Sequence, residues 1–346
     1  MHQQLHHFIG VSEWDDRAVR MLAARHAIEA MRAQGEAPDA WIIDDTGFLK
    51  QGKHSVGVQR QYTGSAGKVT NCQVGVSLSL ANGSAHVPID FELYLPESWA
   101  NDPARRKEGH IPDEVTFKTK PELALEMIER ATRENLPGTI VLADADYGKD
   151  PQFRATVRMH GFDYALGIHS TTNVWCVDRA GRRRGDALTA SALAARLGPA
   201  SGRRVTWREG TSRKLSGRFT FRRVKVAQDD GLGPATRPVE WLIIEWPTDL
   251  TGERKFYLAT LPASMSKRQL VRFLKERWRT ERVYQELKTE LGLDHFEGRR
   301  FRGWHHHVTV ALCCHAFITA ERLRALPPSA DDSLQDDQDD ALCVAA

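Results

Sequence analysis

Three acidic residues stand where their carboxylates can do chemistry together. The apolar runs 41–43 and 141–143 lead straight into Asp44 and Asp144, and each run has the length of a short buried strand. Carboxylates at the carboxyl ends of strands lie at the edge where open α/β sheets carry their sites. Two divalent ions need a third acid, and a long predicted helix near the end of the chain offers Glu281.

The helix that carries Glu281 is predicted over residues 266–291. At about 100° per residue, four side chains fall within about 40° of Glu281 on its surface: Leu270, Leu274, Arg277 and Lys288. An apolar stripe that turns charged predicts a helix that leaves the core and enters a site. The alternative interpretation is a solvent-exposed face on which Glu281 pairs with neighbouring bases.

The elements that must position these acids follow an α/β pattern. Apolar or alternating segments predict strands over residues 41–44, 74–80, 86–95, 138–143 and 162–168. Helical spacing predicts helices over residues 14–34, 121–135, 150–160 and 304–326. Strands and helices in this order are typical of a layered α/β domain.

A different pattern occupies residues 169–263, which we interpret as a β-rich insertion before the helix of Glu281. Short strand-like runs alternate there with glycine, proline and basic loops. Residues 203–225 contain nine basic residues and one acid, with Trp207, Phe219 and Phe221 among them. Such a mixture predicts a phosphate-binding surface; the alternative is a solvated hairpin face whose aromatic residues fill a small core.

Composition and charge narrow the class of protein. The chain has 346 residues, of which 41% are apolar, so it can bury a sizeable core and is not disordered throughout. It has no apolar run long enough to cross a membrane and no signal segment, and its five scattered cysteines are typical of free thiols. We therefore expect an intracellular protein. The net charge is +3, but residues 331–346 carry six Asp and no Lys or Arg, so the rest of the chain is basic and favours a polyanionic partner.

Together these segments resemble the DDE transposases of the IS4-like superfamily, and most closely those of the IS701 type. The resemblance spans roughly residues 1–325, and the segments that carry it are 41–50, 141–148 and 277–296. It implies an RNase H-like fold, in which a mixed sheet is flanked by helices and a β-rich insertion precedes the helix with the catalytic glutamate. The interpretation of residues 169–263 agrees with that fold.

The helix motif is the most specific part of the resemblance. Arg277-x3-Glu281-x6-Lys288 matches the IS4-like signature Y-x2-R-x3-E-x6-K at full spacing. Leu274 stands at the position of the tyrosine, so the resemblance does not extend to the tyrosine's contact to DNA, while the metal ligand is unaffected. The resemblance implies that Arg277 and Lys288 grip phosphates beside the scissile bond; ion pairing on the helix surface is the alternative.

The resemblance implies a transposase that cuts transposon-end DNA and joins the freed 3′-OH to target DNA. Asp44 would bridge two Mg²⁺ ions, with Asp144 and Glu281 each closing one side, and Mn²⁺ would be able to substitute. Two such ions activate the attacking water and stabilise the leaving 3′-oxygen. The expected reaction is therefore two-metal-ion phosphodiester hydrolysis followed by transesterification.

Three neighbouring acids compete for these roles. Asp45 follows Asp44 directly, but strand alternation turns its side chain to the opposite face, where a supporting role is favoured. Asp146 shares the face of Asp144 and is its runner-up. Asp90, in the middle of its predicted strand, fits a paired edge carboxylate better than a metal ligand.

The expected partner is double-stranded DNA, as transposon terminal inverted repeats and as target, bound by a homodimer with no part in a membrane. Beyond the helix motif, the candidate DNA contacts are two basic groups: Arg204, Arg213, Lys214, Arg222 and Arg223 in the insertion, and Arg299, Arg300 and Arg302 after the helix of Glu281. The resemblance also implies a bacterial cytoplasmic protein that acts at the nucleoid.

The predicted organisation has five parts. They are an N-terminal helical segment (1–37), the first part of the catalytic domain (38–168), the basic insertion (169–263), the C-terminal helical part of the catalytic domain (264–326) and an acidic, disordered tail (327–346). Members of the family usually have a longer N-terminal region, which predicts a truncated copy with weaker recognition of the transposon ends.

Two other functions fit parts of the pattern. One is a catalytically idle DNA-binding remnant or domesticated regulator of a transposase, which the abrupt N-terminus favours and the three acids disfavour. The other is a simple RNase H-like nuclease, for which so large a basic insertion is more than the chemistry needs. Nicking of the element's own ends by the wild type, tested beside Glu281→Ala, separates the idle remnant from an active enzyme.

Overall fold

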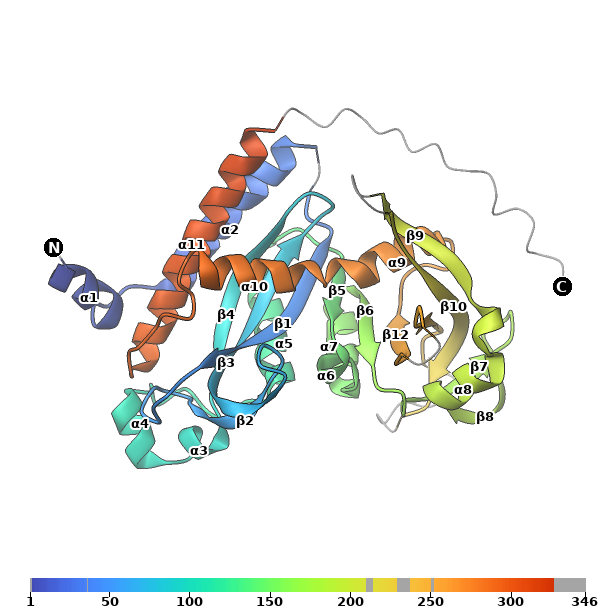
Figure 1. Ribbon diagram of the computed structural model, residues 1–346, viewed down its shortest axis with the longest axis horizontal. Helices are drawn as coiled ribbons and strands as arrows, with labels where there is room; N and C mark the ends of the chain where they lie inside the picture. Colours follow the sequence, from blue (N-terminus) through green and yellow to red (C-terminus); the bar gives the residue numbers. More distant parts are fainter. Residues whose placement is uncertain (1, 36, 210–213, 229–236, 250–251, 327–346) are drawn as a thin grey trace.

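The computed structural model describes residues 2–35, 37–209, 214–228, 237–249 and 252–326. Arg213, one of the predicted DNA contacts, and the acidic tail lie outside these residues. The described strands belong to one twelve-stranded sheet, and helices pack on both of its faces (Figure 1).

The first half of the chain builds the part of the sheet that carries the strand-end acids. In spatial order it contains β4 (His86–Tyr94), β3 (Lys68–Ala81), β1 (Ala40–Leu49), β5 (Ile140–Ala143) and β6 (Asp163–Ile168). β3 is antiparallel to β4 and to β1, whereas β5 and β6 run parallel to β1. This is the strand arrangement of an RNase H-like fold, and the predicted fold class is confirmed.

The β-rich insertion predicted before the helix of Glu281 is present, and it extends the same sheet. β12 (Lys255–Ala259) pairs antiparallel with β6. The remaining strands of the insertion follow in the spatial order β11 (Glu240–Trp246), β10 (Lys214–Val226), β7 (Asn173–Val177) and β8 (Arg183–Thr189), with β9 (Arg203–Glu209) beside β10. The insertion therefore shares main-chain hydrogen bonds with the sheet that carries the acids.

Helices cover the two faces of the central strands. α5 (Lys120–Arg133) and α7 (Pro151–Met159) pack on one face, where α5 begins with a capping box made by Thr119 and Glu122. α9 (Lys267–Glu276) and α10 (Arg279–Thr289) cross the opposite face end to end (Figure 1). The acids on β1 and β5 consequently lie between two layers of helices.

The remaining helices support the edges of the sheet. α2 (Asp16–Ala33) and α11 (Phe301–Arg324) lie side by side against β4. The shorter elements are β2 (Gln59–Thr63), which pairs with β3, α1 (His2–Gly10), α3 (Glu97–Ala100), α4 (Pro103–Gly109), α6 (Ala145–Gly148), α8 (Ala190–Leu197) and a 3₁₀ turn at Pro199–Ser201. Within the described residues, no helix is both long and apolar enough to span a bilayer.

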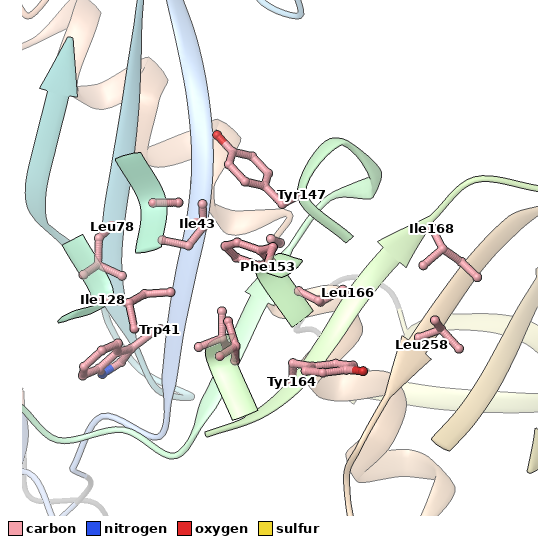
Figure 2. Close-up of a cluster of buried hydrophobic side chains, with 14 of the residues drawn as sticks. Trp41, Ile43, Leu78, Ile128, Tyr147, Phe153, Tyr164, Leu166, Ile168 and Leu258 are labelled. Atoms are coloured by element: carbon pink, nitrogen blue, oxygen red, sulfur yellow. The ribbon is translucent and has the colours of Figure 1, made fainter. Parts of the chain in front are cut away.

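The core on the α5 side also determines which way the acids of β1 point. Figure 2 shows Trp41 and Ile43 of β1 beside Ile128 of α5, in a cluster of buried apolar side chains. Full burial of such a side chain stabilises the fold by about 1.5–3 kcal/mol, so the register of β1 is strongly specified. Because successive residues alternate between faces, Asp44 faces α9 and α10, whereas Asp45 faces α5.

The predicted long helix over residues 266–291 is wrong in one respect, because it is two helices joined by a tight turn. α9 ends at Glu276 and α10 begins at Arg279, and Arg277 and Trp278 keep helical dihedral angles between them. The N–H groups of Trp278, Thr280 and Glu281 donate to carbonyls three residues earlier, at 3.0–3.2 Å. One 3₁₀ turn therefore interrupts the α-helical spacing beside the proposed site.

Candidate active site

Asp44 and Asp144 lie at the same edge of the sheet because their strands are parallel and in register. β1 pairs with β5 from Ala40–Ile140 to Ile42–Leu142, so Asp44 and Asp144 follow two residues beyond the last pair. Burial raises the pKa of Asp44, and the nearby carboxylate of Asp144 raises it further, as expected for like charges held close together. The structure thus brings together the two strand-end acids that the sequence singled out.

The main chain around Asp144 holds its carboxylate in place. Oδ1 of Asp144 accepts a hydrogen bond of 2.9 Å from the N–H of Asp146, because Asp144 is the N-cap of α6. α6 lies directly on β6 at Gly148, where an added Cβ would collide with the carbonyl of Gly167. A small residue at this position is therefore needed to seat α6, and with it Asp144, against the sheet.

Arg277 lies among the three predicted acids. Its Nη1 is 2.9 Å from Oδ2 of Asp44, an ion pair in which the Asp44 side chain is only 12% exposed. Burial alone would lower the pKa of Arg277, but the carboxylates of Asp44, Asp144 and Glu281 raise it above its ordinary value. All three acids therefore act on one positive group, which lies in the turn between α9 and α10.

Glu281 approaches the site from the opposite side. It is exposed at the start of α10 and lines a cavity of about 920 Å³ together with Asp144, Asp146 and Arg277. The far wall of this cavity includes Trp207 and other residues of the insertion. The cavity is large enough for part of a nucleic-acid strand and places the insertion next to the acids.

Burial perturbs the two strand-end carboxylates. It raises the pKa of Asp44 to about 7, although the ion pair with Arg277 opposes the shift. Burial also raises the pKa of Asp144, and Arg277 again opposes the shift. Neighbouring buried carboxylates with raised pKa values, one of which, Asp144, lines a large cavity, are typical of a functional site.

The chemistry of these donors fits a divalent cation. Three carboxylates offer the oxygen ligands that Mg²⁺ and Mn²⁺ prefer, and the guanidinium of Arg277 already pairs with one of them, Asp44. In the described residues, however, no three Asp, Glu, His or Cys side chains are close enough to hold one ion. Asp44, Asp144 and Glu281 would hold a metal only after Arg277, or the turn that carries it, has moved.

Lys288 faces the sheet and not the cavity. Its Nζ donates hydrogen bonds of 2.8 Å to Oγ1 of Thr46 and to the carbonyl of Gly47, both on β1. Burial lowers the pKa of this lysine. Lys288 therefore joins α10 to β1, on the strand that carries Asp44, and its predicted phosphate contact stays a prediction.

The described basic residues predicted in the insertion lie on β9 and β10 and differ in their exposure. Arg222 is exposed, whereas Arg223 is half-buried, donates to the carbonyl of Val239 at 2.6 Å and lies over the ring of Trp241. Arg204 and Lys214 are also exposed, and Arg204 donates to Oγ of Ser216.

The second basic group, at the start of α11, is exposed as well. Arg302 pairs with Glu13 at 2.8 Å, and Arg299 and Arg300 are exposed on the preceding segment. The histidines that follow do not point to a common site. The ring of His305 forms hydrogen bonds with the carbonyl of Phe301 and the carboxylate of Glu92, and the ring of His306 forms one with the carbonyl of Ile9. Asp90 is paired with Arg130 and Arg20 on the other face, as predicted for an edge carboxylate.

Sequence reasoning missed the partners of Asp45. Its Oδ2 accepts from Nζ of Lys120 at 3.0 Å and from the hydroxyl of Tyr147 at 3.3 Å. Lys120 is the first residue of α5 and is far from Asp45 in the chain, so no spacing rule connects them. Tyr147 does lie in the segment 141–148, three residues after Asp144. That position was the one sequence signal that it could lie near the strand-end acids.

This fold and these acids define a class of protein. An RNase H-like sheet carries carboxylates at two adjacent strand ends, and a helix that crosses the sheet brings a third toward the same cavity. Family models match nearly the whole described chain: "DDE superfamily endonuclease" over residues 1–214 and "Transposase DDE domain" over residues 112–317. The chain belongs to the DDE transposase family, as the sequence motifs predicted.

One relative gives a narrower comparison. The chain is 30% identical over 178 residues to the probable transposase for insertion sequence element IS701 of Microchaete diplosiphon. The matched segment covers 51% of this chain and 43% of that protein. The family consists of endonucleases and implies the use of a divalent metal.

Proposed function

We propose that this chain is a transposase that cuts transposon-end DNA and joins the freed 3′-OH to target DNA. The observation that carries the proposal is that Asp44 and Asp144 follow paired parallel strands at one sheet edge, where Arg277 pairs with Asp44 and lines a large cavity with Asp144 and Glu281. Three carboxylates are the donor set that metal-dependent phosphodiester cleavage requires. The match to transposase family models supports the same function.

In this proposal Asp44, Asp144 and Glu281 hold the divalent metal, Mg²⁺ or Mn²⁺ in its place. The bound metal would acidify the attacking water and stabilise charge on the leaving oxygen. Arg277, released from Asp44, would contact a phosphate beside the scissile bond, since a guanidinium binds phosphate with two parallel hydrogen bonds. The cavity between α10 and the insertion would hold the strand to be cut.

The proposed partners are the terminal inverted repeats of the element and a target duplex, bound by a dimer of this chain at the nucleoid. Exposed arginines of the insertion, such as Arg204 and Arg222, support a second contact to the DNA backbone. Arg299, Arg300 and Lys214 are proposed as further contacts on the same ground.

The experiment is cleavage of a duplex that ends in the inverted repeats flanking the gene. The wild type is expected to nick it with Mg²⁺ or Mn²⁺ and to stop when EDTA removes the metal. Asp144→Asn is expected to bind the same duplex without nicking it. Nicking that persists in EDTA, or in Asp144→Asn, would overturn the proposed site.

A second candidate function rests on the ion pair between Arg277 and Asp44. A protein in which this pair never opens would be a DNA-binding remnant or regulator that does not cleave. Tight, strongly salt-dependent binding to the repeats, with no nicking in either metal, would favour that function.

A further inference from the structure

Asp45 lies next to a proposed metal ligand but is turned away from the cavity. Its side chain is 14% exposed on the α5 face of the sheet, where Oδ2 accepts from Lys120 and Tyr147. Removing this carboxylate would leave a half-buried ammonium group and a buried phenol without an acceptor. A buried donor that loses its acceptor destabilises the fold by more than its hydrogen bond contributes to stability. We therefore expect the hydrogen bonds of Asp45 to Lys120 and Tyr147 to persist.

The two partners connect Asp45 to the element that carries the second acid. Tyr147 belongs to α6, the short helix that Asp144 caps. Its ring packs in the buried cluster near Phe153, with the hydroxyl at the edge of that cluster (Figure 2). Burial, and after it the nearby aspartates, raise the pKa of Tyr147 well above its ordinary value, so the hydroxyl stays protonated and donates to Asp45.

Asp45 is also connected to Asp44 by the main chain. The N–H of Asp45 donates to Oδ1 of Asp44 at 2.9 Å, while Oδ2 of Asp44 takes the ion pair with Arg277. A rotation of the Asp45 backbone would therefore turn the Asp44 carboxylate. One residue thus contacts both Asp44 and the helix that Asp144 caps.

We infer that Asp45, held by Lys120 and Tyr147, is a positioning residue that sets the relative placement of Asp44 and Asp144 for one divalent ion. The inference rests on the proposed function, because it takes these two acids as ligands. Groups that orient metal ligands without touching the metal commonly change metal affinity 10- to 100-fold when they are removed. A contact that only joined β1 to α5 would change stability and leave metal affinity unaltered.

The test measures Mn²⁺ binding to the purified protein by titration calorimetry and by the EPR signal of unbound Mn²⁺. Asp45→Asn is expected to weaken Mn²⁺ binding about 10- to 100-fold. Lys120→Met and Tyr147→Phe are expected to weaken it too, and they carry the test if Asp45→Asn does not fold. The double variant Asp45→Asn/Lys120→Met is expected to bind no more weakly than Asp45→Asn, because both changes break one connection.

Asp90→Asn is the matched control. Asp90 is 13% exposed, lies in the same sheet on β4 and accepts from Arg130 on the same face. This variant is expected to lower the unfolding temperature and to keep Mn²⁺ affinity within about twofold of the wild type, because additivity holds for sites without shared partners.

Two results would overturn the inference, and they differ. Wild-type Mn²⁺ affinity in Asp45→Asn, Lys120→Met and Tyr147→Phe would overturn it while leaving the proposed function intact. If Asp44→Asn binds Mn²⁺ as the wild type does, Asp44 is not a ligand, and the proposed function falls together with the inference.

Discussion

The guanidinium of Arg277 lies 2.9 Å from Oδ2 of Asp44, at the 3₁₀ turn between α9 and α10. The same carboxylate is a proposed ligand of the divalent metal, and its other oxygen accepts a hydrogen bond from the N–H of Asp45. A divalent ion bound to Oδ2 would lie against the positive guanidinium, which repels it. The metal and Arg277 therefore compete for Asp44.

Arg277→Gln is expected to bind Mn²⁺ about 10- to 100-fold more tightly than the wild type. The physical reason is that a charged hydrogen bond of about 1.5–3 kcal/mol no longer has to be broken before the ion enters. Titration calorimetry without DNA measures the change. Arg279→Gln is the control, because Arg279 bonds the main chain at Asn82 and not Asp44. Unchanged or weaker binding in Arg277→Gln would show that the pair does not oppose the metal.

The raised pKa of Asp44 predicts a specific dependence of stability on pH. Its folded-state pKa of about 7 lies above the ordinary value of 3.8, so between these values the folded protein keeps a proton that the unfolded chain has released. Stability from this group is therefore lost as pH rises from about 4 to about 7. Asp44→Asn cannot ionise, so its free energy of unfolding relative to the wild type should increase over that range by about 2–4 kcal/mol. Denaturant unfolding from pH 4 to 8 measures this difference, and a constant difference would contradict the pKa.

Lys288 is expected to contribute to stability in the absence of DNA. Lys288→Met removes two hydrogen bonds to β1 and should lower the free energy of unfolding by about 1.5–3 kcal/mol. Arg282→Met, on the exposed side of the same helix and paired with Glu286, should cost less than about 1 kcal/mol. Urea unfolding of both variants measures the contrast. Equal, small losses of unfolding free energy in both variants would mean that the contact of Lys288 to β1 contributes little to stability. Lys288 would then be available to bind a DNA phosphate.

The exposed basic residues of the insertion are expected to bind DNA phosphates. Replacing Arg204 or Arg222 by Ala should weaken binding equally for specific and random duplexes, and each should reduce the slope of log K against log salt by about 1. Arg25→Ala is the comparison, because Arg25 is exposed on α2 and pairs with Glu134, away from the insertion. If the salt slope changes in Arg25→Ala and not in the insertion variants, the DNA binds on a different face of the protein from the insertion.

Local sequence patterns were sufficient to predict the acids on the strands. Apolar runs ending in Asp44 and Asp144 predicted two strand ends, and parallel pairing in register places both carboxylates at one edge. The β-rich character of the insertion was predictable for the same reason, because strand alternation is a local signal. Its continuation of the same sheet was not predictable, since pairing of β12 with β6 is a non-local choice.

The contacts that tune the site were beyond local reasoning. No proline or glycine marks the 3₁₀ turn at Arg277, so the predicted helix ran straight through it. Spacing on a continuous helix placed Lys288 with Glu281, yet Lys288 bonds the main chain of β1 and Glu281 faces the cavity. The pairing of Asp45 with Lys120 depends on how α5 packs on the sheet, which the sequence of neither segment contains.

The most direct test of the central claim compares Glu281→Gln with Glu290→Gln in Mg²⁺-dependent cleavage of terminal-repeat DNA. Both glutamates are exposed on or beside α10, but only Glu281 lines the cavity with Asp144. We predict that Glu281→Gln binds the DNA and loses about 10⁴-fold in cleavage rate, as when one member of a catalytic unit is removed, while Glu290→Gln cleaves like the wild type. Wild-type cleavage by Glu281→Gln, or an equal loss in Glu290→Gln, would contradict the assignment of Glu281 as the third ligand.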